Sequence, residues 1–516
     1  MNKKVPFLIL FYLFFGCGEE RVTENENRLT FYVSPIGNDF NNGTISAPWK
    51  TIQTSIDKLK KNSTLIVKRG VYHEKVILFG DKNSNLTIQG ERGAILDGNN
   101  IDVVEREGLI SIHNAHHITI NNLELRNFKT KKGHRMVETP IGLFIHGSSH
   151  DINITNNKIH HIENLSTCGE STGCGTGANG IAVYGDTRVT MKNLNFIGNE
   201  IYNCILSSSE AFTINGNISG FKVLENYVHD NNNNIGIDII GYEEDVCMNC
   251  LEEENRARNG IVRYNRSINN STNTKLRGFL YNPWYEGNEG SAGGFYVDGG
   301  HHIIFEGNHA SQNDLGFEFA SEHSNKSTND ILMVNNYIYN NREAGLSLGG
   351  YGLNSDEEGG GNASNILIYN NSFYKNSGWG SEISFAYRVY DVRLVNNIIY
   401  GKDDVTLSIS EEDGDYKNLF WGVNLWWRDD GIDSATLYGE LILSNPLYVN
   451  TTAGNLDLSF SSSAKDRGRK QEDIYFGTDA FWKKEFINGI VPSHGISDIN
   501  GNKRFHNEVD LGANEF

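Results

Sequence analysis

The chain has 516 residues, with 55 Gly, 7 Pro and a formal net charge of −19. That length allows a large core or an elongated domain. Aromatic residues make up 11% of the chain, which excludes the composition of a disordered protein. Ala, Leu and Glu do not dominate, as they would in a helical protein. The negative charge disfavours nucleic acid and anionic membranes as partners. We therefore expect short β-runs separated by Gly and Asn.

The N-terminus has the pattern of an export signal. Lys3 and Lys4 precede an apolar run from Val5 to Phe15, which is too short to span a bilayer. The end of this run, Phe14-Phe15-Gly16-Cys17, resembles a bacterial lipoprotein signal, and Glu19-Glu20 resembles the surface-export signal of Bacteroidetes lipoproteins. The resemblance implies a signal peptide over residues 1–17 with lipidation of Cys17, a tether over residues 18–30, and a protein anchored by lipid to the outer membrane and exposed at the surface. An ordinary cleaved signal is the alternative.

Five further cysteines fit an exported protein, in which disulfides are permitted. Cys168 and Cys174 could close a small loop. Cys247 and Cys250 have the spacing of a zinc site, but no second pair lies at a suitable distance. We expect loop disulfides rather than metal, with Cys204 as the unpaired cysteine.

A repeat of about 25 residues runs from Ile95 to about Tyr400, within the range of solenoid repeats. In each repeat a strand such as Ile152-Asn153-Ile154 runs into Asn156-Asn157-Lys158-Ile159. The same phrase recurs at Asn199, Asn226, Asn265, Asn308, Asn336, Asn371 and Asn397. We interpret each repeat as a coil of three short strands that pair with the coils above and below. The recurring Asn predicts an internal ladder of side-chain amides.

A short helix is expected at the start of the stack. Ile52, Ile56 and Leu59 recur at helical spacing. A helix there would cover the open end of the coils, which is otherwise an unpaired edge. The repeat weakens after Gly401, and we interpret residues 31–516 as one domain with loop insertions.

Three strands with a shared pattern define the candidate site. They are Gly236–Gly241, Gly294–Gly299 and Gly316–Ser321, and each alternates in period 2, as a strand with one buried face does. Stacked as neighbouring rungs, they would gather Asp238, Asp298 and Glu318 on one exposed face. With rungs about 4.8 Å apart, Asp238 and Glu318 would lie about 9–10 Å apart and Asp298 about 8 Å from each.

Carboxyl groups at such separations suit an acid and a base with a water between them, the inverting arrangement of glycoside hydrolases, whereas a closer pair would give retention; the directions of the side chains allow both outcomes. Mutual repulsion would raise one pKa and leave a proton donor near neutral pH. Three acids on adjacent rungs could instead bind Ca²⁺, and otherwise no cofactor is expected. A third interpretation is that these acids are solvated groups without chemistry.

The residues around the acids are a mixture that suits sugar recognition, with rings for stacking and amides for hydroxyl groups. Glu210 enters the same face from a turn and is a further acid. The candidate substrate-binding residues are Glu210, Asn215, Asn217, Tyr184, Tyr296, Trp284, Glu322 and His323.

The coils and both ends resemble the right-handed parallel β-helix superfamily, which includes pectate-lyase-like carbohydrate-active proteins. The resemblance implies an all-β fold, a right-handed single-stranded parallel β-helix with an N-terminal cap helix. The segment Asp230 to Asp238 is similar to the coil turns of family-9 pectate lyases that bind Ca²⁺, but here Asn231 to Asn234 stand where Asp is expected.

The lyase reaction also needs a Lys or Arg as base, and neither outward column of the candidate strands contains one. Arg256 and Arg258, or Lys275 and Arg277, would have to reach in from insertions. We therefore expect a monomeric glycoside hydrolase acting on a polysaccharide or oligosaccharide. The alternatives are a Ca²⁺-dependent polysaccharide lyase and a non-catalytic surface glycan-binding protein, with a uronate epimerase as a further option.

Overall fold

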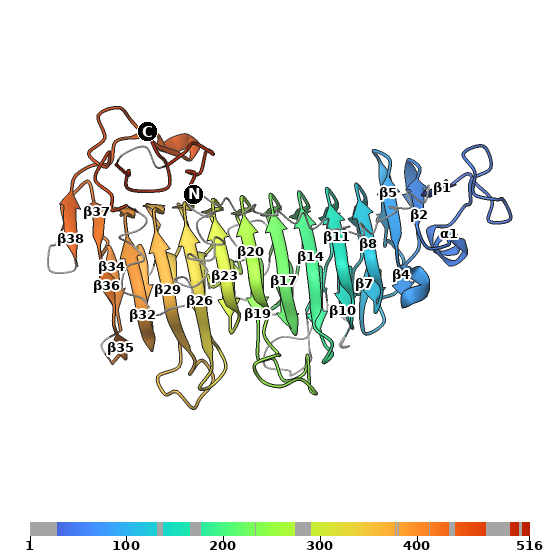
Figure 1. Ribbon diagram of the computed structural model, residues 1–516, viewed down its shortest axis with the longest axis horizontal. Helices are drawn as coiled ribbons and strands as arrows, with labels where there is room; N and C mark the ends of the chain where they lie inside the picture. Colours follow the sequence, from blue (N-terminus) through green and yellow to red (C-terminus); the bar gives the residue numbers. More distant parts are fainter. Residues whose placement is uncertain are drawn as a thin grey trace, which may run out of the picture.

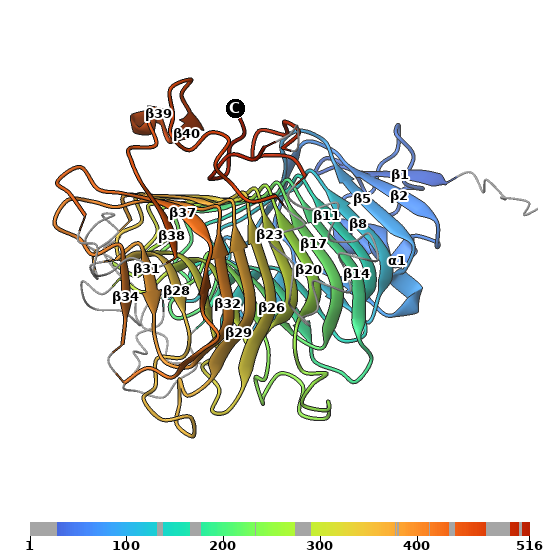
Figure 2. The same ribbon diagram turned by 60° about the vertical axis from the view of Figure 1, so that its left-hand side comes forward.

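The computed structural model describes residues 28–516 except 132–137, 166–176, 233, 274–289, 377, 379–380, 412, 433–438, 471–495 and 505–507. The chain winds into a column of coils, with the N-terminal coil at one end of the long axis and β38 at the other (Figure 1). Strands of successive coils stack in parallel (Figure 2), so the fold is a right-handed parallel β-helix. The predicted fold class is confirmed.

Three parallel sheets form the walls of the column. Among the described residues, sheet 1 has 14 strands: β1 (Leu29–Val33), β2 (Ser63–Val67), β5 (Leu86–Gly90), β8 (His116–Asn121), β11 (His150–Thr155), β14 (Met191–Ile197), β17 (Ile218–Leu224), β20 (Arg258–Arg263), β23 (His301–Glu306), β26 (Ser327–Val334), β29 (Asn362–Tyr369), β32 (Val389–Val395), β35 (Tyr416–Lys417) and β36 (Phe420–Trp421).

Sheet 2 carries the candidate site and has 11 strands within the described residues: β4 (Val76–Phe79), β7 (Arg106–His113), β10 (Thr139–His146), β13 (Asn179–Gly185), β16 (Phe212–Gly216), β19 (Ile237–Ile240), β22 (Gly293–Asp298), β25 (Leu315–Ala320), β28 (Ala344–Leu348), β31 (Ile383–Phe385) and β34 (Ser408–Ser410).

Sheet 3 closes the coil and has 13 strands in the same described part: β3 (Gly70–Tyr72), β6 (Ala94–Asp97), β9 (Glu124–Arg126), β12 (Lys158–His160), β15 (Glu200–Tyr202), β18 (Tyr227–His229), β21 (Arg266–Ile268), β24 (His309–Ser311), β27 (Tyr337–Tyr339), β30 (Ser372–Tyr374), β33 (Ile398–Tyr400), β37 (Val423–Trp427) and β38 (Glu440–Leu443).

The recurring Asn residues form the predicted internal ladder. From Asn157 to Asn424, each buried amide nitrogen donates to the amide oxygen of the next Asn along the column at 2.9–3.1 Å. Each amide oxygen also accepts a backbone N–H of the preceding coil, as Asn308 does from Asn265 at 2.9 Å. The ladder satisfies buried backbone groups at a turn that has no strand partners.

A second ladder, which the sequence did not predict, runs parallel to the first. Its members are Asn231, Asn270, Asn313, Asn341 and Asn376, linked amide to amide. Asn231 belongs to this ladder, because its Oδ1 accepts the backbone N–H of Cys204 at 3.1 Å and its amide nitrogen donates to Asn270 and to the Ile201 carbonyl.

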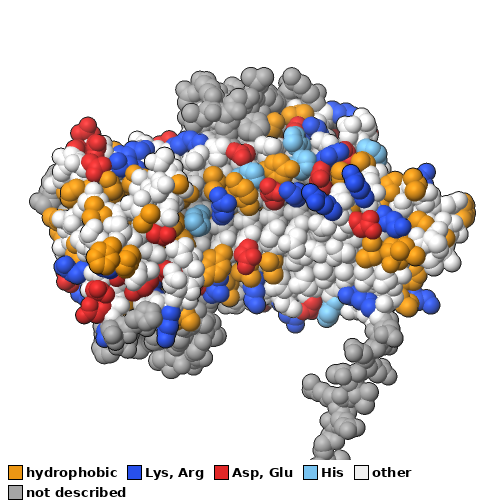
Figure 3. Space-filling view, turned by 90° about the horizontal axis from the view of Figure 1, so that it is seen from above, with side chains coloured by type: hydrophobic (Ala, Val, Ile, Leu, Met, Phe, Trp, Pro, Cys, Tyr) orange, Lys and Arg blue, Asp and Glu red, His pale blue; other side chains and the backbone are white. Residues whose placement is uncertain are grey.

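A helix covers the N-terminal end of the column, and the segment after the last coil packs beside sheet 3. The predicted cap helix is present as α1 (Ile52–Lys58), with Ile52 and Ile56 buried against the first coils. At the other end, β39 (Tyr448–Asn450) and β40 (Asn455–Leu458) form a hairpin after the last coil, and the final segment folds back beside sheet 3 (Figure 1). Acidic, basic and His side chains are mixed on the face shown in Figure 3, so the excess negative charge is not gathered there.

No helix among the described residues is long and apolar enough to cross a membrane. Residues 1–17, with Cys17, and the Cys168–Cys174 loop lie outside the described residues. Cys247 and Cys250 form a disulfide, which confirms the expected loop staple. In the described part of the chain Cys204 is a free, buried thiol, as expected.

Candidate functional site

The strand register of sheet 2 reproduces the predicted column of outward residues. Thr213 pairs with Asp238, Asp238 with Tyr296, Tyr296 with Glu318 and Glu318 with Ser347. The neighbouring column runs from His146 through Tyr184 and Asn215 to Ile240, and Asp298 pairs with Ala320 one strand further on. Asp238, Asp298 and Glu318 therefore lie on the same face of three successive strands, as predicted.

The position of a buried Asn ladder explains why each site strand starts with a glycine. The second Asn ladder passes directly beside these glycines. A Cβ on Gly294 would lie 2.5 Å from the amide nitrogen of Asn313, and one on Gly316 would lie 3.0 Å from that of Asn341. The next residues, Phe295 and Phe317, stack in the core with ring centroids 4.7 Å apart. The alternating strand then directs Tyr296 and Glu318 outward.

The predicted exposure of this face is wrong for two of its three acids, which are buried by the strands and loops around them. Asp238 is 3% exposed and Asp298 is 5% exposed. Burial, and then Glu210 and Asp298, raise the pKa of Asp238 well above its usual value. Burial, and then Glu322, raise the pKa of Glu318 to about 8. Burial and Glu243 likewise raise the pKa of Glu210 to about 7. Glu318 therefore holds its proton at neutral pH and can donate it.

Hydrogen bonds fix some of these groups and leave others without protein partners. The Tyr296 hydroxyl donates to Glu322 at 3.3 Å, and the backbone N–H of Glu322 donates to Asp298 Oδ1 at 2.9 Å. Among the described residues, the buried oxygens Asp238 Oδ1 and Asn215 Oδ1 have no hydrogen-bond partner. Atoms of this kind on an outward face suit the hydroxyl groups of a ligand.

The insertion after β19, residues 242–257, supplies a wall beside the acids. Glu243 Oε1 lies 3.8 Å from His323 Nε2, and His323 Nε2 lies 3.7 Å from Asp298 Oδ2. Burial, and then Asp245, raise the pKa of Glu243 to about 7. The sequence did not single out Glu243, because nothing in the insertion distinguishes it from Glu244 or Asp245. A cavity of about 610 Å³ opens on the insertion near the disulfide.

Two predicted binding residues have other roles or positions. Asn217 is fully buried between β16 and β17, where its amide donates to the Thr187 carbonyl and accepts from Arg258. It is therefore a structural residue and does not face the site. Trp284 lies outside the described residues, as do Lys275 and Arg277.

The insertion arginines that a lyase would need as bases are held elsewhere. Arg256 is 4% exposed, donates to the Gly299 and Ser327 carbonyls, and stacks on Tyr242. Arg258 donates to the Glu254 and Arg256 carbonyls. Arg106, which the sequence did not indicate, does approach the site and stacks 5.0 Å above the Tyr184 ring.

The three acids do not form one metal-binding group. Within the described residues, Asp238 and Glu318 belong to no set of three possible ligands whose donor atoms lie within 4.8 Å of one another, whereas Glu243, Asp298 and His323 form such a set. Asp238 and Glu318 therefore do not join Asp298 in a three-ligand set of the kind that the alternative Ca²⁺ interpretation requires.

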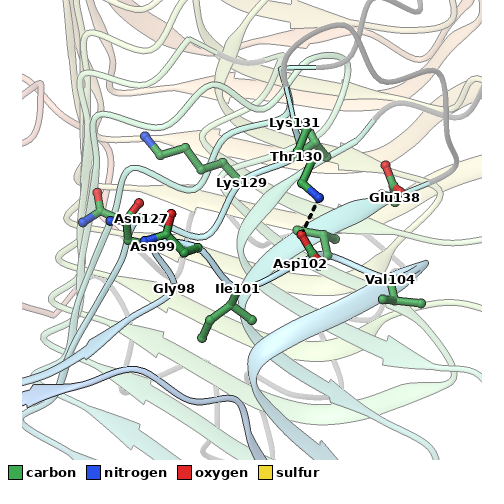
Figure 4. Close-up of a pocket in the computed structure, with 12 residues that line it drawn as sticks. Gly98, Asn99, Ile101, Asp102, Val104, Asn127, Lys129, Thr130, Lys131 and Glu138 are labelled. Atoms are coloured by element: carbon green, nitrogen blue, oxygen red, sulfur yellow. Dashed lines mark ion pairs between the residues drawn. The ribbon is translucent and has the colours of Figure 1, made fainter.

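A further hollow of about 380 Å³ lies at the edge between sheets 3 and 2, beside β7 and β10. Figure 4 shows its lining, in which Lys131 and Asp102 form an ion pair of 2.7 Å. These two side chains are 70% and 69% exposed, so the pair is weak. β13 and β16 separate β10 from the Asp238 strand.

Comparison with known proteins assigns the family. The chain is 35% identical to the uncharacterized protein YwoF of Bacillus subtilis (strain 168) over 459 residues, which cover 84% of this chain and 92% of YwoF. The chain belongs to the YwoF family. No family model matches it.

Solved structures with some likeness to this YwoF-family chain include carbohydrate-active enzymes. A GH136 lacto-N-biosidase from Eubacterium ramulus is 13% identical, with a TM-score of 0.47 over 81% of this chain and 68% of that one. Pectate lyase Pel9A is 13% identical, with a TM-score of 0.44 over 87% and 94% of the two chains. A PL6 alginate lyase is 12% identical, with a TM-score of 0.45 over 82% and 90%. Likeness at this level is too low to carry an argument about activity.

Proposed function

We propose that the protein is a carbohydrate-active enzyme, and specifically a glycoside hydrolase that binds a glycan along sheet 2. The observation that carries the proposal is the pair Asp238 and Glu318 on one outward column, on either side of Tyr296. The two strands are two rungs apart, about 9.6 Å at the backbone. This separation is close to the range of about 6.5–9.5 Å between the carboxyl groups of inverting glycosidases.

Glu318 is the proton donor in this proposal, because its pKa of about 8 keeps it protonated at neutral pH. Asp238, whose Oδ1 has no hydrogen-bond partner within the described residues, activates water in its ionised form, which forms only as the pH rises through its raised pKa. Asp298 moves to a positioning role, since one of its oxygens accepts the Glu322 N–H and the other faces His323. Tyr184, Tyr296 and Asn215 would contact the sugar.

The test is a screen of polysaccharides with the purified protein, read for new reducing ends and for the ultraviolet absorbance of unsaturated uronates. We expect new reducing ends without that absorbance, and inversion of the anomeric configuration by NMR. Unsaturated products would establish a lyase instead. Binding of glycan with no product of either kind would establish a binding protein.

Export and lipid attachment through Cys17 are part of the same proposal. The support is the pattern of basic, apolar and Cys residues at the N-terminus. Metabolic labelling with a fatty acid tests it, and labelling that persists in Cys17→Ser would contradict it.

A further inference from the structure

A mixed set of nitrogen and oxygen donors lies beside the proposed acid–base pair, and only one of them, Asp298, has a part in the reaction as proposed. Asp298 comes from the end of β22, His323 from the loop after β25, and Glu243 from the insertion after β19. Their donor atoms all lie within 4.8 Å of one another. We propose that Glu243, Asp298 and His323 bind a divalent transition-metal ion such as Zn²⁺.

The separations between the donor atoms fit one ion. Two ligands that each lie about 2.1 Å from a metal are at most about 4.2 Å apart. His323 Nε2 lies 3.7 Å from Asp298 Oδ2 and 3.8 Å from Glu243 Oε1, so both pairs fall within that limit. The Glu243 side chain is 40% exposed and can rotate to complete the set.

The donors are oriented as metal ligands are. The Glu322 backbone N–H holds Asp298 Oδ1 at 2.9 Å, which leaves Oδ2 directed at His323. Such hydrogen bonds to the second carboxylate oxygen fix the ligand in known metal sites. His323 Nε2 is buried and, among the described residues, has no hydrogen-bond partner. A buried ring nitrogen between two carboxylates is satisfied by a cation.

The surrounding charge also favours a cation. Glu322 and Glu318 act electrostatically on Asp298, and Glu210 and Glu322 act on Asp238; all of these groups are acidic. The nearby cations have other contacts, since Lys326 pairs with Glu252 at 2.6 Å. A cleft of one sign with low-dielectric walls concentrates ions of the opposite sign.

The donor set selects the type of ion. Ca²⁺ takes six to eight oxygen ligands, whereas one imidazole and two carboxylates suit Zn²⁺ or a neighbouring first-row metal. Three protein ligands leave a coordination position for water or a sugar oxygen in the groove. The inference does not depend on the hydrolase proposal, because the site is defined by binding and not by turnover.

A second cluster of similar composition provides the control. His301, His302 and Asp330 also group within 4.8 Å. There, however, the His301 and His302 Nδ1 atoms contact each other at 2.6 Å, and Arg256 and Arg258 act on His301 with positive charge. We expect no metal at that cluster.

The experiment measures Zn²⁺ bound per chain in untagged protein, by equilibrium dialysis with elemental analysis and by calorimetry, with Ca²⁺ as the competing probe. His323→Asn and Glu243→Gln should each remove one Zn²⁺ site or weaken it on the order of 100-fold, and His302→Asn should leave it unchanged. Excess Ca²⁺ should not displace Zn²⁺.

Unchanged Zn²⁺ binding in both His323→Asn and Glu243→Gln would overturn the proposal, as would loss of the site in His302→Asn alone. Glu243→Gln keeps the test decisive if His323→Asn does not fold, because Glu243 lies on a partly exposed insertion. Absence of turnover on every glycan in the unmodified protein, with intact Zn²⁺ binding, would count against the hydrolase assignment of Asp238 and Glu318 and not against this site.

Discussion

Glu318 is the proposed proton donor because its carboxyl group keeps its proton at neutral pH. The side chain is half-buried, with Glu322 as the acidic neighbour that adds to the effect of burial on its pKa. Glu318→Gln removes the proton donor and should lower turnover by about 10²–10⁴-fold without changing the fold. In the unmodified protein, turnover should fall as the pH rises through about 8, where Glu318 loses its proton.

Steady-state kinetics across pH, with circular dichroism as a check of folding, measure this effect. Glu200→Gln is the matched control, because Glu200 lies on sheet 3, where it pairs with Lys158. Equal losses in the two variants, or a basic limb unrelated to Glu318, would remove Glu318 from the reaction.

The same raised pKa values predict how stability depends on pH. Glu318, with a pKa of about 8, and Glu210 and Glu243, with pKa values of about 7, bind protons in the folded state that the unfolded chain has already lost above its pKa of about 4.5. Because the folded state binds more protons in this window, the free energy of unfolding should decrease between about pH 5 and pH 8. Urea titrations at several pH values measure it. The decrease of the free energy of unfolding with pH should be smaller in Glu318→Gln. An unchanged decrease in this variant would contradict the raised pKa of Glu318.

At the scale of the element, the first Asn ladder holds neighbouring coils together. Asn308 accepts from the Asn265 N–H and side chain and donates to the Val262 carbonyl and to Asn336. Asn308→Ala leaves buried backbone groups without partners, so it should lower the free energy of unfolding by about 3–5 kcal/mol. Chemical denaturation measures this loss.

Asn195→Ala is the control for the ladder. Asn195 is only half-buried, and its amide nitrogen donates a hydrogen bond to Asn153 on the outside of sheet 1. This change should cost no more than about 1 kcal/mol. Similar losses at Asn308 and Asn195 would mean that the buried ladder contributes nothing beyond a surface hydrogen bond.

The ladders also explain how much of the site could be predicted from the sequence. One Asn marks the same position in every coil, so the outward columns follow by counting, and Asp238, Asp298 and Glu318 were placed on their strands in this way. The prediction that Asn217 faces the site was wrong, because β16 ends at Gly216, where a φ of +87° turns the chain before the strand reaches Asn217. Glu243 could not be predicted, because an insertion has no period and its approach to His323 depends on the path of the loop.

At the scale of the whole molecule, the strands of each coil pair only with strands of adjacent coils in the described part of the chain, as in other solenoids. The final segment is different, because it ties the C-terminus to coils far upstream in the sequence. Arg504 is fully buried there, donates to Asn335 at 2.9 Å and pairs with Glu515 at 3.1 Å. Asn370 donates to the Asp510 carbonyl in the same region. Sequence periodicity could not reveal these contacts, since the final segment contains no repeat.

Removing Arg504 should therefore loosen the end of the column without affecting the site. Arg504→Ala leaves Glu515 buried without its cation, which should lower the free energy of unfolding by about 3–5 kcal/mol. Arg469→Ala, which removes an Arg that is 40% exposed and paired with Glu440, should cost at most about 1 kcal/mol. Calorimetry should show an earlier transition for Arg504→Ala, while turnover well below that transition stays unchanged, because the Asp238 and Glu318 strands lie on sheet 2 and the final segment packs beside sheet 3. A loss of turnover in Arg504→Ala well below its unfolding transition would show that the coils transmit the change along the column.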